Sequence, residues 1–212
     1  MLDGVKKLAI HGKAKTGKNT VAKLIHEICN YDVYETAFAL PVKNELINLF
    51  GIDREYLFGP SQKRQELYDP IEEVTYRDLL IQFGEFCKKY DPNIWIKKTE
   101  TSILKDYFSP ELKQPEDIVI NQNSLYLNTY FKLKEYKLIL ITDLRFMREY
   151  EWLKKEGFKI LKLTRSNNDY SNNDLSETEL DKMADNFYDY HVFNDGTLDD
   201  LSSQVRDLLT KL

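Results

Sequence analysis

The sequence predicts an α/β protein in which a mostly parallel central sheet is flanked by helices. Along its 212 residues, short apolar runs of strand character alternate with segments whose apolar residues recur at helical spacing. One run, residues 137–142, is almost continuously apolar, as expected of a central parallel strand buried on both faces. The length suits one sizeable core, and we therefore expect a single domain over residues 1–212.

Composition and net charge exclude some classes of binding partner. The net charge of −5 would repel a phosphate backbone, so a nucleic-acid polymer is not an expected partner. Two cysteines, Cys29 and Cys87, are too few for a disulfide framework and favour a reducing compartment. No run approaches the roughly 20 apolar residues of a membrane span, and no signal-peptide pattern opens the chain. We expect a cytoplasmic protein without a membrane partner.

A glycine-rich loop follows the first apolar run, residues 8–10, and opens an amphipathic helical pattern. The loop consists of Gly12, Lys13, Ala14, Lys15, Thr16, Gly17, Lys18, Asn19 and Thr20. Its glycines let backbone N–H groups curl inward toward the positive end of the helix, which makes a hollow for phosphate. Lys18 follows the second glycine, where a lysine can reach the outer phosphates of a nucleotide. This spacing is that of a Walker A motif.

The motif predicts the three-layer fold of P-loop NTPases, with a surface turn rich in Lys and Gly as the alternative. It departs from the usual pattern at Asn19, where a Ser or Thr normally reaches Mg²⁺. The hydroxyl comes one residue later, so we expect Thr20 to be the metal ligand. If the loop is a Walker A motif, the expected cofactors are ATP and Mg²⁺.

The next segments, residues 39–107, read as a mainly helical part. A short strand over residues 33–38 leads into a helix that begins near Ala39, and residues 51–68 read as a surface excursion. Thr75 caps a helix over residues 76–89, whose predicted buried stripe is Leu79, Leu80, Phe83 and Phe86. Arg77 lies in the first turn of that helix, where a cation opposes the dipole, which favours an anionic partner over a merely solvated side chain.

The second half continues the alternation. Residues 110–136 read as an inserted β-hairpin or a loop, and the strand over residues 137–142 ends in Asp143. A carboxylate at the carboxyl end of such a strand can hold Mg²⁺ as a Walker B acid does, or it can cap a helix. A helix over 148–156, a strand over 158–164 and a last strand over 190–193 follow, and Thr197 caps the closing helix. Residues 166–183 are too polar to pack in a core, and we expect them to form either a mobile lid over the phosphates or a disordered connection.

Several segments together resemble the viral and phage deoxynucleoside monophosphate kinases, which are P-loop kinases. The matching segments are residues 12–20, 40–43, 75–80 with Gly84, 95–96, 142–145, 176–177 and 194–198. The resemblance implies transfer of the γ-phosphoryl of ATP to a 2′-deoxynucleoside 5′-monophosphate, in the host cytoplasm if the protein is viral. Two alternatives stay open: a kinase of another small acceptor, such as a sugar acid or dephospho-coenzyme A, and a nucleotide-binding regulatory protein without turnover. A homodimer is also left open.

The resemblance also implies site residues. The implied catalytic residues are Lys18, Asp143, Arg145 and Arg165. The implied acceptor-binding residues are Lys43, Arg64, Arg77 and Trp95, although a tryptophan in an apolar helix also suits the core. Residues 110–136 have no counterpart in the family, and no arginine lies between Arg165 and the last strand. An arginine that covers the transferring phosphoryl group therefore has to be Arg145, Arg148 or Arg165.

Overall fold

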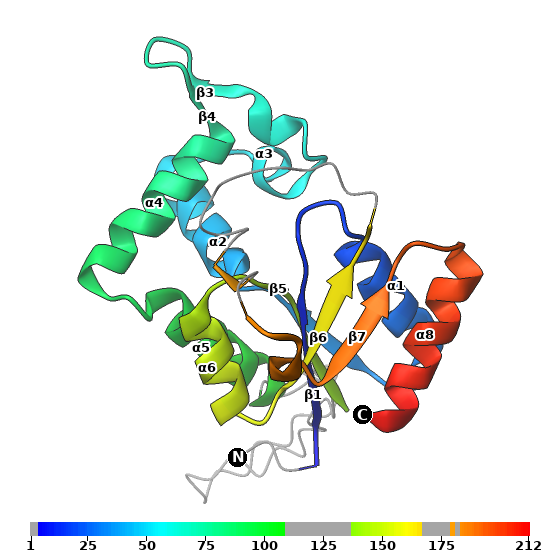
Figure 1. Cartoon of the computed structure of the whole chain (residues 1–212). Helices are drawn as coiled ribbons and strands as arrows, with labels where there is room; N and C mark the ends of the chain where they lie inside the picture. The colour runs from blue at the N-terminus through cyan, green and yellow to red at the C-terminus, as the bar shows by residue number, and fades with distance from the viewer. Residues whose placement is uncertain (1–3, 109–136, 167–178, 181–182) are drawn as a thin grey trace, which may run out of the picture.

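The computed structural model describes residues 4–108, 137–166, 179–180 and 183–212. Five strands form its central sheet: β1 (Lys6–His11), β2 (Val33–Thr36), β5 (Leu138–Leu144), β6 (Lys159–Thr164) and β7 (Tyr190–Phe193). Their order is β2-β5-β1-β6-β7, and every neighbouring pair is parallel (Figure 1). The predicted α/β class with a mostly parallel sheet is confirmed.

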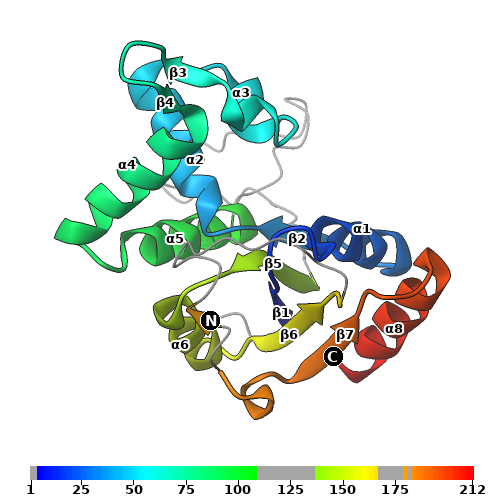
Figure 2. The same cartoon turned by 45° about the horizontal axis from the view of Figure 1, so that its top comes forward.

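Helices cover both faces of this sheet and make the structure three layers deep. One face is covered by α1 (Lys18–Ile28) and α8 (Leu198–Lys211), and the other by α5 (Ile94–Phe108) and α6 (Met147–Lys155) (Figures 1 and 2). Alternation along β1 explains why two layers form: Leu8 and Ile10 join the core on the α1 side, whereas Ala9 joins the core on the α6 side. All three are fully buried.

A third group of elements lies to one side of the sheet (Figure 2). It contains α2 (Ala39–Phe50), α3 (Arg54–Phe58), a 3₁₀ turn (Lys63–Gln65), the short strands β3 (Leu67–Asp69) and β4 (Val74–Thr75), and α4 (Tyr76–Tyr90). Strands β3 and β4 are antiparallel and form their own two-stranded sheet. This group has a small core of its own, built from Leu46, Ile52 and Leu57.

Two expectations for this group were wrong. Residues 51–68 are more than a surface excursion, because α3 forms there and its Leu57 is completely buried. Phe86 was expected in the buried stripe of α4 but is 54% exposed and contacts Tyr90 edge-on. Helical periodicity places Phe86 near the stripe, yet α5 packs on α4 at Gly84 and leaves Phe86 exposed.

The order of the strands places the loop after β1 where the chain changes direction across the sheet. Strand β1 lies between β5 and β6, and the chain therefore leaves β1 toward one edge and later builds the other edge. In open α/β sheets, ligands bind outside the carboxyl ends of the strands where the order reverses in this way. The predicted hairpin at 110–136 and most of the predicted lid at 166–183 lie outside the described residues.

Candidate active site

The P-loop connects β1 to α1 by a path that only glycine allows at two positions. A Cβ on Gly12 would lie 2.6 Å from the carbonyl oxygen of Leu163. Gly17 has a φ of +101°, in the left-handed region, and a Cβ there would collide with the side-chain amide of Asn194. The glycines that the Walker A motif requires are thus fixed by close neighbours on β6 and after β7.

Side chains and backbone of the loop also bond to one another. The Thr16 hydroxyl donates to the carbonyl of Lys13 at 2.8 Å, and Thr16 is buried. The Lys18 ammonium donates to the carbonyls of Gly12 at 2.5 Å and Lys13 at 2.8 Å, so it lies across the loop. This is the place from which a lysine neutralises phosphate bound to such a loop.

The start of α1 suits an anion. Gly17 occupies the N-cap position and has no side chain with which to cap the helix, and no acidic residue lies in its first turn. At helix N-termini of this kind a phosphate oxygen can take the place of a capping side chain. Thr20, the expected metal ligand, is exposed within that first turn.

Asp143 lies at the carboxyl end of β5, beside the loop that follows β1, and is 9% exposed. Its two carboxylate oxygens accept from the backbone N–H groups of Phe38 at 2.6 Å and Ala39 at 2.9 Å. It therefore caps the start of α2, a helix far from it in the sequence, whereas the helix cap that the sequence left open would have made Asp143 an N-cap residue itself. Both oxygens keep lone pairs that a cation or its water could use, and the Mg²⁺ role stays a prediction.

Five cationic side chains are linked by the effects of their charges on one another, through either Lys43 or Arg64. They are Lys43 on α2, Arg54 on α3, Arg64 in the 3₁₀ turn, Arg77 on α4 and Arg145 after β5, and we call them the cation cluster. Burial, followed by the charges of Arg64, Arg145 and Arg54 and against the opposing effect of Asp143, lowers the pKa of Lys43 to about 8. Burial, followed by the charge of Arg77, lowers the pKa of Arg64. Like charges held this close favour a bound anion.

Neighbouring groups hold the cluster in place. The Arg64 guanidinium donates to the carbonyls of Leu57 at 3.2 Å and Gly59 at 3.3 Å. The Phe58 ring lies 3.9 Å from the guanidinium carbon of Arg54 and 4.8 Å from the ammonium of Lys43, as ring centroid distances. The cations thus rest on carbonyl oxygens and an aromatic ring, which stabilise positive charge without removing it.

A buried carboxylate fixes the turn that carries Arg145. Glu149 on α6 accepts from the backbone N–H groups of Arg145 at 2.8 Å and Phe146 at 3.0 Å. Burial, followed by the charge of Asp143, raises the pKa of Glu149 to about 8. Sequence reasoning missed both Glu149 and Arg54, because a glutamate in a polar helix and an arginine in a charged segment resemble ordinary surface residues.

Arg165 lies outside the cation cluster, and Trp95 and His11 serve packing. Arg165 is exposed directly after β6. Trp95 is 7% exposed, and its indole N–H donates to the carbonyl of Gly84 at 3.1 Å, so it joins α5 to α4 as a core residue. A contact between Trp95 and an acceptor base stays a prediction that this packing does not support. The ring nitrogen Nδ1 of His11 lies 3.1 Å from the carbonyl oxygen of Leu144, and the ring stacks on Tyr188.

Two further observations concern the cysteines and the hydropathy of the helices. Both cysteines are free thiols, as expected. Within the described part of the chain, no helix has the length and apolar character needed to cross a membrane.

Comparisons with known proteins give one sequence match with a functional name. No protein-family model matches the chain. The chain is 22% identical over 201 residues to a protein of Acanthamoeba polyphaga mimivirus described as "Putative deoxynucleotide monophosphate kinase", with 93% of each chain covered. Among solved structures it is similar to a Thermus thermophilus protein (14% identity, TM-score 0.48, 99% of each chain) and to the dephospho-CoA kinase of Campylobacter jejuni (15% identity, TM-score 0.46, covering 97% and 96%).

Proposed function

We propose that this protein transfers the γ-phosphoryl group of ATP to a 2′-deoxynucleoside 5′-monophosphate. The observation that carries the proposal is that the P-loop follows β1, while the cation cluster includes Arg145, which directly follows the adjacent parallel strand β5. A P-loop alone suits any nucleotide. A second cationic site beside it suits an acceptor that is itself a phosphate, because repulsion among the five cations falls when a dianion binds.

The sequence similarity supports the same class of reaction. The mimivirus protein carries the name of a deoxynucleotide monophosphate kinase and matches nearly the whole chain. At 22% identity it supports a nucleotide kinase in general. The choice of a deoxynucleotide as acceptor rests on that name and on the resemblance of residues 75–80 and 95–96 to the acceptor side of such kinases.

The residues of the site would act mainly by positioning and charge neutralisation. The loop N–H groups and Lys18 would bind the outer phosphates of the donor, and Arg77 and Arg64 would bind the acceptor phosphate. Arg145, whose charge lowers the pKa of Lys43, would neutralise charge on the transferring phosphoryl group. The acceptor is already an anion, so no strong general base is needed.

The residues present fit a Mg²⁺ ion that is held mostly by substrate. Among the described residues no cluster of three or more His, Cys, Asp or Glu side chains could hold a metal alone. Mg²⁺ commonly takes one or two protein oxygens and completes its shell with phosphates and water. Thr20 and Asp143 would supply those oxygens, and the ion would neutralise charge on the donor phosphates.

An assay of ADP release across acceptors tests the proposal. We expect ADP only when Mg·ATP and a deoxynucleoside monophosphate are both present. Lys18→Ala should lower kcat by about 100-fold or more, because a charge beside the transferring group is lost. Lys23→Ala is the matched control, since Lys23 lies on the same helix but is exposed and pairs with Glu27.

Other outcomes identify the alternatives. ADP release at equal rates without any acceptor would make the protein an ATPase. Release with dephospho-coenzyme A or a sugar acid, and not with deoxynucleotides, would make it a kinase of that acceptor. Nucleotide binding without any release would make it a regulatory nucleotide-binding protein.

A further inference from the structure

The turn between β7 and α8, residues 194–196, contacts two parts of the candidate site that are far apart in sequence. The side-chain amide of Asn194 donates to the carbonyl of Thr16 in the P-loop at 2.8 Å, across 178 positions of the chain. The backbone N–H of Asn194 donates to the carbonyl of Thr164 at the end of β6 at 2.8 Å. One residue therefore ties β6, β7 and the P-loop together.

The contact with Thr16 controls the direction of one peptide group. A trans peptide is planar, so its C=O and N–H point in opposite directions. When Asn194 binds the Thr16 carbonyl, the N–H of Gly17 must point away from Asn194. If this peptide turned over, the carbonyl would face the phosphate side and repel an anion there. The φ of +101° at Gly17 makes such a flip accessible, since glycine tolerates both signs of φ.

The neighbouring Asp195 contacts the segment that follows β6. Its carboxylate accepts from the backbone N–H of Ser166 at 2.6 Å and from the Ser166 hydroxyl at 2.8 Å. These hydrogen bonds, with a smaller effect from the charge of Arg165, lower the pKa of Asp195. The peptide bond between Arg165 and Ser166 is thus held by the same turn that holds the P-loop.

We propose that the turn at residues 194–196 is a brace of the nucleotide site, in which Asn194 and Asp195 are positioning residues. Asn194 sets the direction of the peptide between Thr16 and Gly17, and Asp195 sets the backbone at Ser166 beside Arg165. The inference rests on the proposed nucleotide-binding role of the loop. It adds two residues outside the Walker A motif on which that role depends.

Limited proteolysis with trypsin tests the brace without nucleotide or acceptor. The P-loop carries the trypsin sites Lys13 and Lys15, and Asp195 holds the bond after Arg165. Asn194→Asp keeps the shape of the side chain but replaces the donor with an acceptor, and we expect cleavage after Lys15 to be about fivefold faster or more. Asp195→Ala should accelerate cleavage after Arg165 and leave the P-loop sites unchanged. Mass spectrometry identifies each site.

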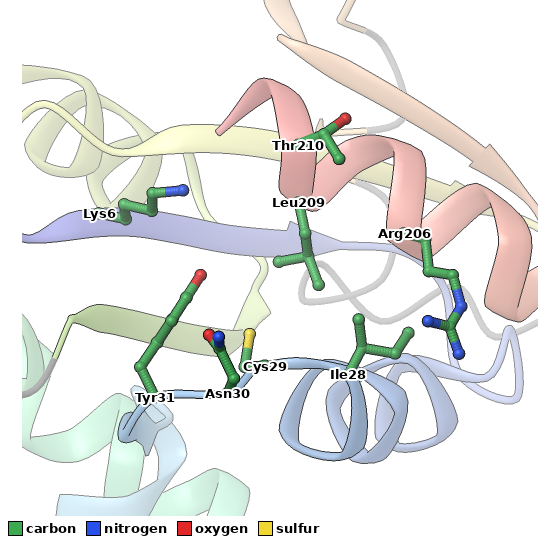
Figure 3. Close-up of a pocket in the computed structure, with 8 residues that line it drawn as sticks. All are labelled: Lys6, Ile28, Cys29, Asn30, Tyr31, Arg206, Leu209 and Thr210. Carbon is green, nitrogen blue, oxygen red and sulfur yellow. The ribbon is translucent and has the colours of Figure 1, made fainter.

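The matched control is Asn30→Asp. Asn30 is exposed in an open hollow of about 360 Å³ at the opposite end of α1, with residues from the end of α8 across from it (Figure 3). The same substitution there should leave cleavage in the P-loop at the wild-type rate. A thermal melt of each variant shows whether the protein is still folded.

Nucleotide affinity supplies the functional readout. Asn194→Asp should raise the Kd for Mg·ATP, measured by calorimetry, about 10-fold, whereas Asn194→Gln, which keeps a donor, should fall between. Wild-type cleavage after Lys15 in Asn194→Asp would overturn the brace, and so would equal acceleration at every trypsin site. If the wild-type protein binds no Mg·ATP, the proposed function fails, while the cleavage pattern still decides whether the brace exists.

Discussion

At the scale of single residues, the pKa of Lys43 links the structure to a measurable pH dependence. Burial and the neighbouring cations lower this pKa to about 8, so Lys43 loses its charge as the pH rises through that value. In the proposed function Lys43 helps to bind the acceptor phosphate, and this role requires its charged form. We therefore expect kcat/KM for the acceptor to fall above pH 8, by up to about tenfold per pH unit. Steady-state kinetics from pH 6.5 to 10 give the profile.

Lys43→Arg is the control, because a guanidinium stays charged throughout this range and should remove the fall near pH 8. The stability of the wild-type protein should increase with pH over the range in which kcat/KM falls. The unfolded chain binds more protons between pH 8 and an ordinary lysine pKa of about 10.5, so the free energy of unfolding should rise across that window. A wild-type profile that stays flat to pH 10 would contradict the assigned role of Lys43.

Arg77 tests the acceptor side independently of the nucleotide motif. A guanidinium can hold two phosphate oxygens in a planar fork, whereas a lysine offers a point charge and an alanine offers nothing. We expect Arg77→Ala to raise the acceptor KM about 10- to 100-fold and to leave the affinity for ATP within about twofold. Arg77→Lys should fall between.

Arg206→Ala is the matched control for that experiment, since Arg206 lines the hollow at the far end of the sheet (Figure 3). Steady-state kinetics with each substrate varied in turn measure both constants. If the affinity for ATP falls as much as that for the acceptor, Arg77 does not bind the acceptor phosphate, and Arg64 or Lys43 becomes the better candidate.

At the scale of elements, the start of α4 decides where Arg77 lies. Thr75 and Asp78 form a capping box: the Asp78 N–H donates to the Thr75 hydroxyl and the Thr75 N–H donates to the Asp78 carboxylate, both at 3.1 Å. Loss of such a cap costs about 1 kcal/mol of stability and frays the first turn. We therefore expect Thr75→Ala to lower the melting temperature and to raise the acceptor KM.

The chain offers a matched helix for comparison. Thr197 and Asp200 form the same capping box on α8, away from the cation cluster. Thr197→Ala should also lower the melting temperature, but it should leave the acceptor KM unchanged. If both variants raise the acceptor KM equally, general destabilisation explains the effect and the first turn of α4 has no special part in acceptor binding.

At the scale of the whole molecule, binding should appear as stability. A ligand at 100 times its Kd adds about 2.7 kcal/mol to the free energy of unfolding, and for a chain of this size each kcal/mol raises the melting temperature by roughly 2–4 °C. We therefore expect saturating Mg·ATP to raise the melting temperature by about 5–10 °C. Lys18→Ala should lose most of that shift, and an unchanged melt of the wild type would speak against a nucleotide site.

The class of the fold and the position of the P-loop can be predicted from the amino-acid sequence. Both predictions rest on local patterns, because a strand, two glycines at fixed spacing and an amphipathic helix each involve neighbouring residues. Thr75 and Thr197 indicate helix starts for the same reason. Asp143 was also placed correctly at the end of its strand, although the sequence left its role open between metal ligand and helix cap.

Contacts between residues far apart in the chain could not be predicted from the sequence. The cation cluster joins residues from α2, α3, α4, a 3₁₀ turn and the end of β5, and no spacing in the sequence predicts that Arg54 belongs to it. The same holds for Asn194, which reaches Thr16 across the sheet, and for Trp95, whose indole N–H finds Gly84 in the core. The physical reason is that a local pattern fixes backbone conformation, whereas burial, charge repulsion and long-range hydrogen bonds depend on how separate elements pack.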